Sequence, residues 1–513
     1  MNIVAPNVAG GGSTLFDTRS AAGNLGDIVI TGSNDGRAKK LVKAGLISDM
    51  TPYMKGMKYL KQYSGATDAF QKVAGVKSGI YGIPASVSSS APTSSSEGTE
   101  PTFGPYIRWD LYKEAGYPEI KTLDDLIPIL KDMQTKARAE NNDQKIYALS
   151  LFKDWDGNMM NNAKQPTTFY GYDELGFVLA KADGSDYQGI TQTNGQYVKA
   201  LRFFNKAKQA GLVDPESSTQ NYDTMYSKYT NGKALFSFWP WLGQAAYNTT
   251  ARKEAGKGFM LAPVQDMKIF SYGNTTNGSS TFIGIGSKAK NKQRLVKFIN
   301  WLYSPEGVSA AGAQTGGTSG PEGLTWKMEG KQPVLTDFGK KVFLEGGAKV
   351  PAKWGTGNYK DGVSQLNYPA VMPNDINHET KYSYSYTLWP SVLEDTKTKL
   401  DSDWSSHMDN AKTTMDYLKK TKKILVAPGA SYVTPEEDSE ISSLRGQIKT
   451  QIVNTSWKMT MASSDSEFDS LLKKMQTTVD GLGYKKVLKV DMKNAKDQNK
   501  ARVAIKKEYA NKK

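Results

Sequence analysis

The segment 281–317, TFIGIGSKAKNKQRLVKFINWLYSPEGVSAAGAQTGG, decides the fold of this chain. Apolar residues alternate with glycine from Phe282 to Ile285, which predicts a buried strand. Asn291 suits the N-cap of a following helix, because apolar residues then recur at helical spacing at Leu295, Phe298, Ile299 and Leu302. Ser304-Pro305-Glu306 predicts a second helix, since serine caps, proline fits the first helical position and glutamate faces the positive helix end.

Four other segments are informative when they are taken together with segment 281–317. They are GDIVITGSND (26–35), YGIPASVSSS (81–90), PYIRWDLYKEAGYPEIKTLDDL (105–126) and YTNGKALFSFWPW (229–241). With segment 281–317, and in this order, they resemble bacterial extracellular solute-binding proteins of the family 1 type, the sugar-capturing lipoproteins of ABC importers. The resemblance implies an α/β, two-lobed periplasmic-binding-protein-like fold of the class II type. It also implies a ligand cleft between the lobes and a helical C-terminus.

Length and composition agree with two lobes. With 513 residues, of which 38% are hydrophobic, the chain can build two sizeable cores. We expect lobe I to comprise residues 1–107 and 281–325. Lobe II should comprise 108–280 and 326–513, including C-terminal helices that lie over both lobes. The pattern T-P-E-E at 434–437 matches a capping box, and apolar residues at helical spacing follow it.

The residue inventory bears on function. The chain has no cysteine and only two histidines, His378 and His407. Disulfides and thiolate catalysis are therefore excluded, and a zinc site or a histidine-based triad is disfavoured. We expect a binding protein without a cofactor rather than an enzyme. A glycoside hydrolase stays open as an alternative, since it needs only two suitably spaced carboxylates.

The formal net charge of +15 has two interpretations. It can mark a nucleic-acid or anionic-surface binder, or a lysine-rich solvated surface. We favour the second and expect no nucleic-acid partner, because no nucleic-acid motif accompanies the charge; attraction to an anionic cell wall or an acidic glycan stays open. An anionic or other non-sugar solute is the corresponding alternative ligand.

The location of the protein is suggested by the resemblance. No stretch approaches the roughly 18 apolar residues of a membrane span. The resemblance implies a signal peptide and a lipidated cysteine upstream of Met1, so we expect a truncated start. The precursor would be an extracellular, cell-surface lipoprotein of the Gram-positive type, held to the membrane only by that N-terminal lipid. We expect a monomer that delivers its ligand to ABC-transporter permease subunits.

Two predicted strands end in polar residues. Asn34 and Asp35 follow strand 28–31, and ligands of open α/β sheets bind at carboxyl strand ends. These side chains are candidates to hold sugar hydroxyls, or they form an Asx-type turn before the next helix. Trp155 and Asp156 follow the predicted strand 147–152 and are candidates for stacking on a sugar and accepting its hydroxyl hydrogen bonds.

The same loop has two other interpretations. Asp154, Asp156 and Asn158 have the D-x-D-x-N spacing that begins a calcium loop. The glycine is misplaced for an EF-hand, however, and Gln165 stands where the bidentate glutamate is required. A plain surface turn is the remaining interpretation. We therefore expect no metal, with calcium as a weak candidate.

Tryptophans supply the other candidate ligand contacts. Trp239 and Trp241 bracket Pro240 at the end of the predicted strand 234–238, and the resemblance places a sugar-facing tryptophan pair at the matching point of maltose-binding proteins. Trp354 and Trp389 belong to the irregular aromatic segment 350–390. Packing in the core is the alternative for all four. We expect a captured oligosaccharide, with lobe closure about hinges near 106–109 and 272–281.

Overall fold

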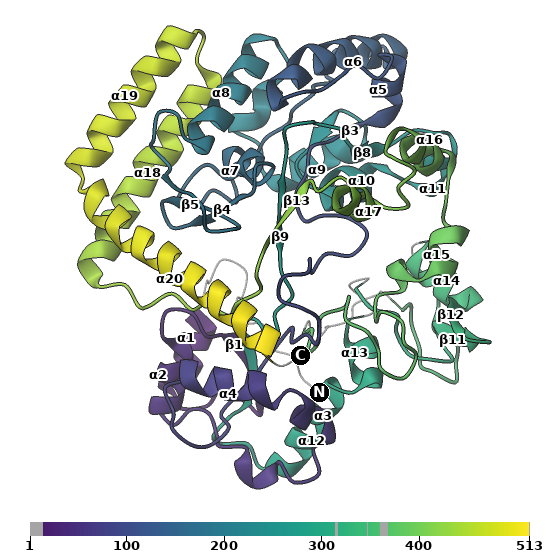
Figure 1. The fold of residues 1–513 in the computed structure, drawn as a ribbon, viewed down its shortest axis with the longest axis vertical. Coiled ribbons are helices and arrows are strands. Elements are labelled where there is room, and N and C mark those ends of the chain that lie inside the picture. The colour runs from purple at the N-terminus through teal and green to yellow at the C-terminus, as the bar shows by residue number, and fades with distance from the viewer. Residues whose placement is uncertain (1–13, 313–316, 346, 360–367, 512–513) are drawn as a thin grey trace.

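The computed structural model describes residues 14–312, 317–345, 347–359 and 368–511 (Figure 1). Helices and strands form a lower body, an upper body and a smaller unit beside them, and the last helix runs from the upper body toward the lower one. The neighbours in fold described below share the expected two-lobed α/β architecture. In the described part of the chain, no helix has the length and apolar character needed to cross a bilayer.

The lower body is built on a three-stranded sheet in the order β1 (Ile28–Gly32), β10 (Thr281–Ile285), β2 (Ile83–Pro84). In this sheet β10 runs antiparallel to both neighbours, with Ile283 opposite Ile30 and Ile83. Its helices are α1 (Thr14–Ala21), α2 (Arg37–Lys43), η1 (Thr51–Tyr53), α3 (Lys58–Gln62), α4 (Ser64–Val73), α12 (Lys292–Leu302) and α13 (Pro305–Ala311). The strand and two helices predicted from segment 281–317 are confirmed.

The upper body holds the largest hydrophobic cluster. One of its sheets has the order β7 (Phe236–Ser237), β3 (Tyr106–Arg108), β8 (Phe259–Leu261), and a second has β4 (Tyr172–Leu175), β5 (Val178–Lys181), β6 (Tyr187–Gly189). Its helices are α5 (Trp109–Glu114), η2 (Leu123–Asp125), α6 (Leu126–Asn141), α7 (Asn161–Thr168), α8 (Gln196–Gln209), η3 (Pro215–Ser218), α9 (Tyr222–Thr230), α10 (Pro240–Tyr247), α11 (Thr250–Glu254), α16 (Lys399–His407) and α17 (Thr414–Lys420). The predicted strand 147–152 forms only isolated bridges, in which Tyr147 pairs with Ala234 and Leu149 with Val213.

A smaller unit follows the lower body in sequence. It contains the hairpin β11 (Trp326–Glu329) and β12 (Gln332–Leu335), with α14 (Asp337–Phe343), η5 (Tyr386–Leu388) and α15 (Pro390–Asp395). Figure 1 shows it at the right, apart from the helices of the upper body. Its apolar residues form small clusters of their own. The boundary predicted from the sequence places residues from 326 onward in lobe II, and that assignment stays a prediction.

Three chain segments connect the bodies. Two positions in these connections have no room for a side chain and require glycine. β9 (Ile269–Tyr272) and β13 (Ile424–Ala427) run parallel, and the segment 88–104 passes beside them. A Cβ on Gly273 would lie 2.0 Å from the Pro92 carbonyl oxygen, and one on Gly429 would lie 2.0 Å from that of Asn274. The segment 88–104 reaches the upper body before the predicted hinge at 106–109, because β3 already belongs to the upper sheet.

The C-terminus forms three helices, α18 (Ser439–Met461), α19 (Asp465–Gly481) and α20 (Tyr484–Asn511). The predicted capping box at 434–437 is wrong. Asp438 caps α18 by accepting the Ile441 N–H (2.8 Å), while Glu436 pairs with Lys40 (2.6 Å). α18 packs on α8, and α20 lies against α18, α19 and the β4–β5–β6 sheet.

Candidate functional site: an aromatic platform

Four aromatic rings from three segments meet at the edge of the upper body. Trp155 stacks on Tyr222, with ring centroids 4.8 Å apart, and Trp239 stacks on Trp241 at 4.9 Å. The two pairs meet through Trp155 and Trp241, whose centroids are 5.7 Å apart. We call these four residues the aromatic platform. Trp155 is 45% exposed and Trp241 39% exposed, whereas Trp239 is only 4% exposed. Trp239 therefore supports rings that solvent can reach.

The two tryptophans around Pro240 differ in exposure because a helix begins between them. Trp239 is the N-cap of α10 and has an extended backbone, while Pro240 takes the first helical position. The Ser237 hydroxyl fixes this turn by donating to the Trp239 carbonyl (2.8 Å) and accepting the Gly243 N–H (3.2 Å). As a result one indole turns into the core and the other stays at the surface.

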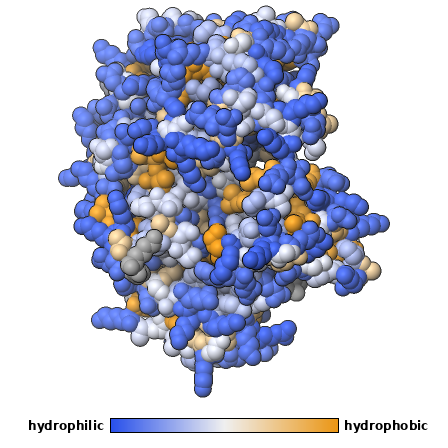
Figure 2. Space-filling view, turned by 45° about the vertical axis from the view of Figure 1, so that its right-hand side comes forward, coloured by the Kyte–Doolittle hydropathy of each residue, from blue (hydrophilic) through white to orange (hydrophobic). Residues whose placement is uncertain are grey.

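The platform lies beside the connections between the bodies. The Gly104 N–H, on the chain arriving from the lower body, donates to the carbonyl of Phe238 at the end of β7 (2.9 Å). Farther along α10, Gln244 approaches Glu100 of the same connection (3.5 Å). Burial raises the pKa of Glu100. In Figure 1, α9 and α10 occupy the half of the upper body nearer the lower one, and in Figure 2 the apolar residues of the visible face gather at mid-height.

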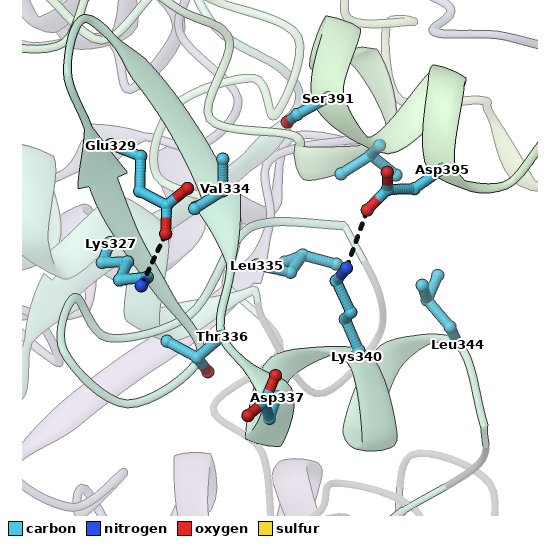
Figure 3. A pocket seen from close by; sticks show the side chains of 11 residues that line it. Lys327, Glu329, Val334, Leu335, Thr336, Asp337, Lys340, Leu344, Ser391 and Asp395 are labelled. Atoms are coloured by element: carbon cyan, nitrogen blue, oxygen red, sulfur yellow. Dashed lines mark hydrogen bonds and ion pairs between the residues drawn. The ribbon is translucent and has the colours of Figure 1, made fainter.

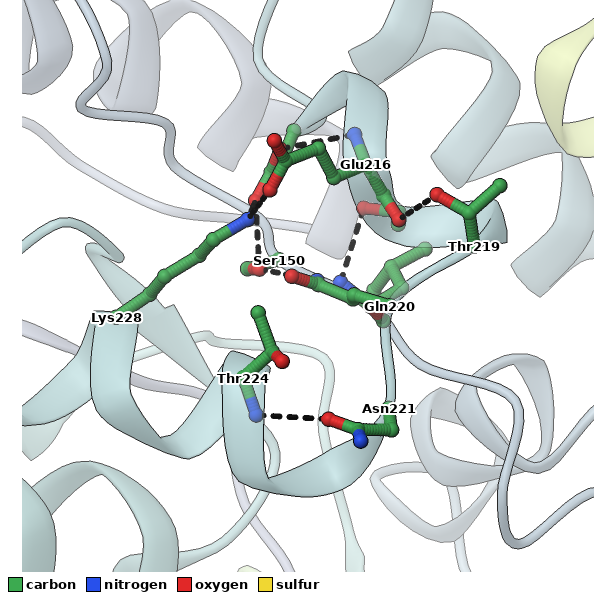
Figure 4. A network of polar contacts seen from close by, with 10 residues as sticks. Ser150, Glu216, Thr219, Gln220, Asn221, Thr224 and Lys228 are labelled. Atoms are coloured by element: carbon green, nitrogen blue, oxygen red, sulfur yellow. Dashed lines mark hydrogen bonds and ion pairs between the residues drawn. The ribbon is translucent and has the colours of Figure 1, made fainter.

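A polar network fixes the position of the Tyr222 segment (Figure 4). Lys228 of α9 forms ion pairs of 2.6 Å with Asp214 and with Glu216. Asp214 also accepts the Ser150 hydroxyl (2.9 Å), and Gln220 donates to that hydroxyl (2.7 Å). The network thus ties the start of α9 to the segment that leads to Trp155.

Two carboxylates complete the support of the Trp155 loop. Asp154 accepts the backbone N–H of Tyr222 (2.7 Å), which brings the two stacked rings together. Asp156 accepts the Asn161 N–H (2.8 Å) and the indole N–H of Trp457 on α18 (2.7 Å). Burial raises the pKa of Asp156, although both hydrogen bonds oppose the shift. Neither carboxylate is therefore aimed at a common cation, and the described residues contain no group of three His, Cys, Asp or Glu side chains suited to a metal.

Residues 16–323, more than half of the chain, match the family model of bacterial extracellular solute-binding proteins. The chain belongs to this family. Members are solute-binding transport proteins found outside the cell, so the hydrolase alternative does not fit. A search of curated proteins found no match.

Solved structures show the same fold at low identity. An HMO-binding solute-binding protein associated with an ABC transporter, from Bifidobacterium longum infantis, is 17% identical, with a TM-score of 0.57 over 93% of this chain and 89% of that chain. An EF-hand mutant of the ABC-transporter substrate-binding protein FusA from S. pneumoniae, in complex with fructo-nystose, is 14% identical, with a TM-score of 0.58 over 94% and 90%. The alginate-binding protein AlgQ2 without calcium ion is 14% identical, with a TM-score of 0.54 over 95% and 88%.

Asn34 and Asp35 of this solute-binding protein lie apart from the platform. They form an exposed turn after β1, in which the Arg37 N–H donates to the Asn34 carbonyl (3.0 Å) and Asp35 has a positive φ of 55°. Neither side chain caps α2. The turn begins where Ser33 donates to the carbonyl of Ser280 (2.8 Å), at the end of the lower sheet that faces the connections.

The two remaining candidate tryptophans differ in exposure. Trp354 is 43% exposed in the smaller unit. Trp389 is only 2% exposed; its indole N–H donates to the carbonyl of Ser383 (2.8 Å), and its ring lies 5.7 Å from that of Trp326. Trp389 therefore packs in the core, which was the alternative to a ligand contact. Its indole N–H is already hydrogen-bonded and its ring already packs on that of Trp326.

The smaller unit also has a cavity of about 440 Å³ (Figure 3), and none of the four platform residues lines it. The hairpin β11–β12 and helices α14 and α15 surround it. Four of its five charged side chains already pair with one another, Lys327 with Glu329 (2.6 Å) and Lys340 with Asp395 (2.7 Å); the fifth is Asp337. Because these charges neutralise each other at the rim, the cavity offers less to a ligand than the open faces of the platform.

Sequence reasoning missed two supports of the site, Tyr222 and Trp457. Tyr222 carried one usable signal, since Asn221 before it is a good N-cap residue and does accept the Thr224 N–H (2.9 Å). A ring in the first turn of a helix is held rigidly. Trp457 carried no signal, because its contact with Asp156 joins residues that are far apart in the sequence.

Proposed function

We propose that this protein captures a carbohydrate, an oligosaccharide, between its two bodies and delivers it to the permease of an ABC importer. The observation that carries the proposal is the aromatic platform, in which Trp155 and Trp241 expose large ring areas beside the connections between the bodies. Family membership supports the binding role, and the sugar ligands named for neighbours in fold support the ligand class.

The chemistry of the platform suits sugar rings. A pyranose has one face of C–H groups, and a rigid indole supplies contact area to it at a small entropic cost. Trp239 and Tyr222 lie behind or beside the exposed rings, so these rings keep their orientation before a ligand arrives. A preorganised site loses less affinity to the ordering of side chains. Two exposed rings side by side favour a ligand with more than one sugar unit.

Capture requires that the bodies move. We assign lobe I to the lower body and lobe II to the upper body with its C-terminal helices, and the hinge to the connections at Gly273 and Gly429. Closure would bring the loop at Asn34 and Asp35, and the unit carrying Trp354, toward a ligand on the platform. The protein acts as a monomer at the cell surface, anchored through an N-terminal lipid of its precursor.

The test is a thermal-shift screen followed by calorimetry with neutral and uronic-acid oligosaccharides. A ligand at one hundred times its Kd should stabilise the fold by about 2.7 kcal/mol. Trp155→Ala and Trp241→Ala should each weaken binding at least tenfold. Trp301→Ala is the matched control, because that partly exposed indole stacks on Phe298 in the lower body, away from the platform.

Two results would overturn the proposal. One is a cooperative melt without a shift for any glycan. The other is equal loss of affinity in the control and platform variants. Binding that falls steeply with salt would instead assign the site to an anionic solute, because salt screens charge contacts much more than stacking.

A further inference from the structure

Helix α20 carries a large part of the excess positive charge of the chain. Between Tyr484 and Asn511 it has eight lysines and one arginine against three acidic residues, while the whole chain has a net charge of +15. All eight lysines are exposed. In Figure 1 the helix runs from the upper body toward the lower one, and Tyr509 near its end reaches the carbonyl of Ser89 (3.4 Å).

Six of the eight lysines of α20 lie on one side of the helix. The buried face of the helix contains Tyr484, Val487, Asp491, Ala495, Arg502 and Ile505. On the opposite side, steps of three, four or seven residues align six lysines, which we call the lysine row: Lys485, Lys489, Lys493, Lys496, Lys500 and Lys507. At 1.5 Å per residue the row extends over about 33 Å. No acidic residue of the helix lies within it.

Ion pairs account for only half of the lysine row. Asp497 beside the row pairs with Lys493 (2.7 Å) and Lys500 (2.8 Å), and Lys485 pairs with Asp480 (3.3 Å). Lys489, Lys496 and Lys507 form no ion pair or hydrogen bond with any described residue. Like charges four residues apart destabilise a helix, and the row contains three such pairs. Lys489 and Lys496 therefore add like-charge repulsion to their own helix and gain no ion pair in return.

The form of the row indicates its partner. Lysine side chains are flexible point charges, which suit an array of anions better than one shaped pocket. A straight, one-sided row of this length matches a flat anionic surface, and each lysine near such a surface contributes to its attraction. The protein belongs to an extracellular family, and delivery to a permease, as proposed above, would bring it to a membrane.

We propose that the lysine row of α20 docks on anionic phospholipid headgroups and holds the protein at the membrane surface. The use of this contact in delivering solute rests on the proposed function, whereas the lipid binding itself does not. Docking along α20 would place the connection between the bodies near the bilayer, because the helix runs from one body toward the other.

The experiment is co-sedimentation of the full chain with vesicles of phosphatidylcholine, with and without 30% phosphatidylglycerol. The test variant is Lys489→Gln, Lys496→Gln, Lys507→Gln, which removes no ion pair among described residues. The matched control is Lys199→Gln, Lys297→Gln, Lys449→Gln, three exposed helical lysines that likewise form no such pair. Circular dichroism checks that both variants fold.

We expect the wild type to bind only the anionic vesicles and to dissociate from them in 0.5 M salt. The test variant should bind at least tenfold more weakly, and the control within twofold of the wild type. Absence of wild-type binding, or equal loss in the control, would overturn the proposal. Binding of soluble polyphosphate in place of vesicles would also overturn it and indicate a polymeric partner. Oligosaccharide affinity, measured without vesicles, should be the same in all three proteins, so failure here is separable from failure of the proposed function.

Discussion

Asp156 gives the sharpest test of how the platform is supported. Its carboxylate accepts the Asn161 N–H and the Trp457 indole N–H, and Trp457 is only 4% exposed. Asp156→Ala would remove both acceptors and leave a buried indole N–H without a partner. Since hydrogen bonds to charged groups contribute about 1.5–3 kcal/mol each, we expect the free energy of unfolding to fall by about 3 kcal/mol. Trp155, the preceding residue, should also lose its fixed orientation.

Asp156→Asn separates the charge from the hydrogen bonds. The amide keeps one acceptor oxygen, so the expected loss near neutral pH is about 1 kcal/mol. Burial raises the pKa of Asp156 above the unfolded value of about 3.9. A raised pKa contributes stability that is present below pH 3.9 and is lost as the pH rises through the folded pKa. The advantage of the wild type over Asp156→Asn should therefore be largest at acidic pH and shrink toward neutrality.

The assay is urea unfolding followed by far-ultraviolet circular dichroism at several pH values, with oligosaccharide affinity measured on the same samples. Asp68→Ala is the control, since Asp68 is exposed on α4 and has no partner among the described residues; it should change stability by less than 0.5 kcal/mol. A loss below 0.5 kcal/mol for Asp156→Ala, or an advantage over asparagine that grows with pH, would refute the reasoning.

Three other predictions concern the rest of the fold. Arg445→Ala leaves the buried Asp491 carboxylate, now 2.6 Å from that guanidinium, without its cation, so urea unfolding should show a loss of roughly 3–5 kcal/mol; a loss below 1 kcal/mol would contradict this. Gly273→Ala forces the connecting segments apart and should abolish ligand-induced compaction in X-ray scattering, whereas Gly65→Ala, with open space around it, should not. Trp354→Ala should raise the Kd for the oligosaccharide at least threefold, and unchanged calorimetry would remove Trp354 from the site.

Local signals were sufficient where the chain obeys local rules. In segment 281–317, Asn291 accepts the Arg294 N–H (3.1 Å) and Ser304 accepts the Gly307 N–H (3.1 Å), as the two predicted caps require. These contacts span three residues, so a sequence pattern contains all the information they need. The same is true of the capping box at Thr122, whose N3 residue is Asp125.

Local signals failed where contacts outside the motif decided the outcome. The motif at 434–437 has a good capping pattern, but Glu437, the glutamate that the box requires, pairs with Arg445 of α18, and Asp438 caps the helix instead. The tryptophans show the same limit. Trp241 and Trp389 both stand next to a proline, yet one is 39% exposed and the other 2%, because burial depends on which surfaces the whole fold brings together.

The contacts that hold the platform limit how the protein would close around a ligand. Trp155 is connected through Asp156 to Trp457 on α18, and Tyr222 is connected through Asp154 to the same loop. α18 packs on α8 inside the upper body, so the exposed rings are fixed to one body by several independent contacts. Hinge motion therefore cannot adjust the rings to the ligand, and the second wall of the site must move toward them. Under the proposed function, the lower body and the unit with Trp354 would therefore determine which ligand length fits, while the platform would provide the face on which a sugar binds.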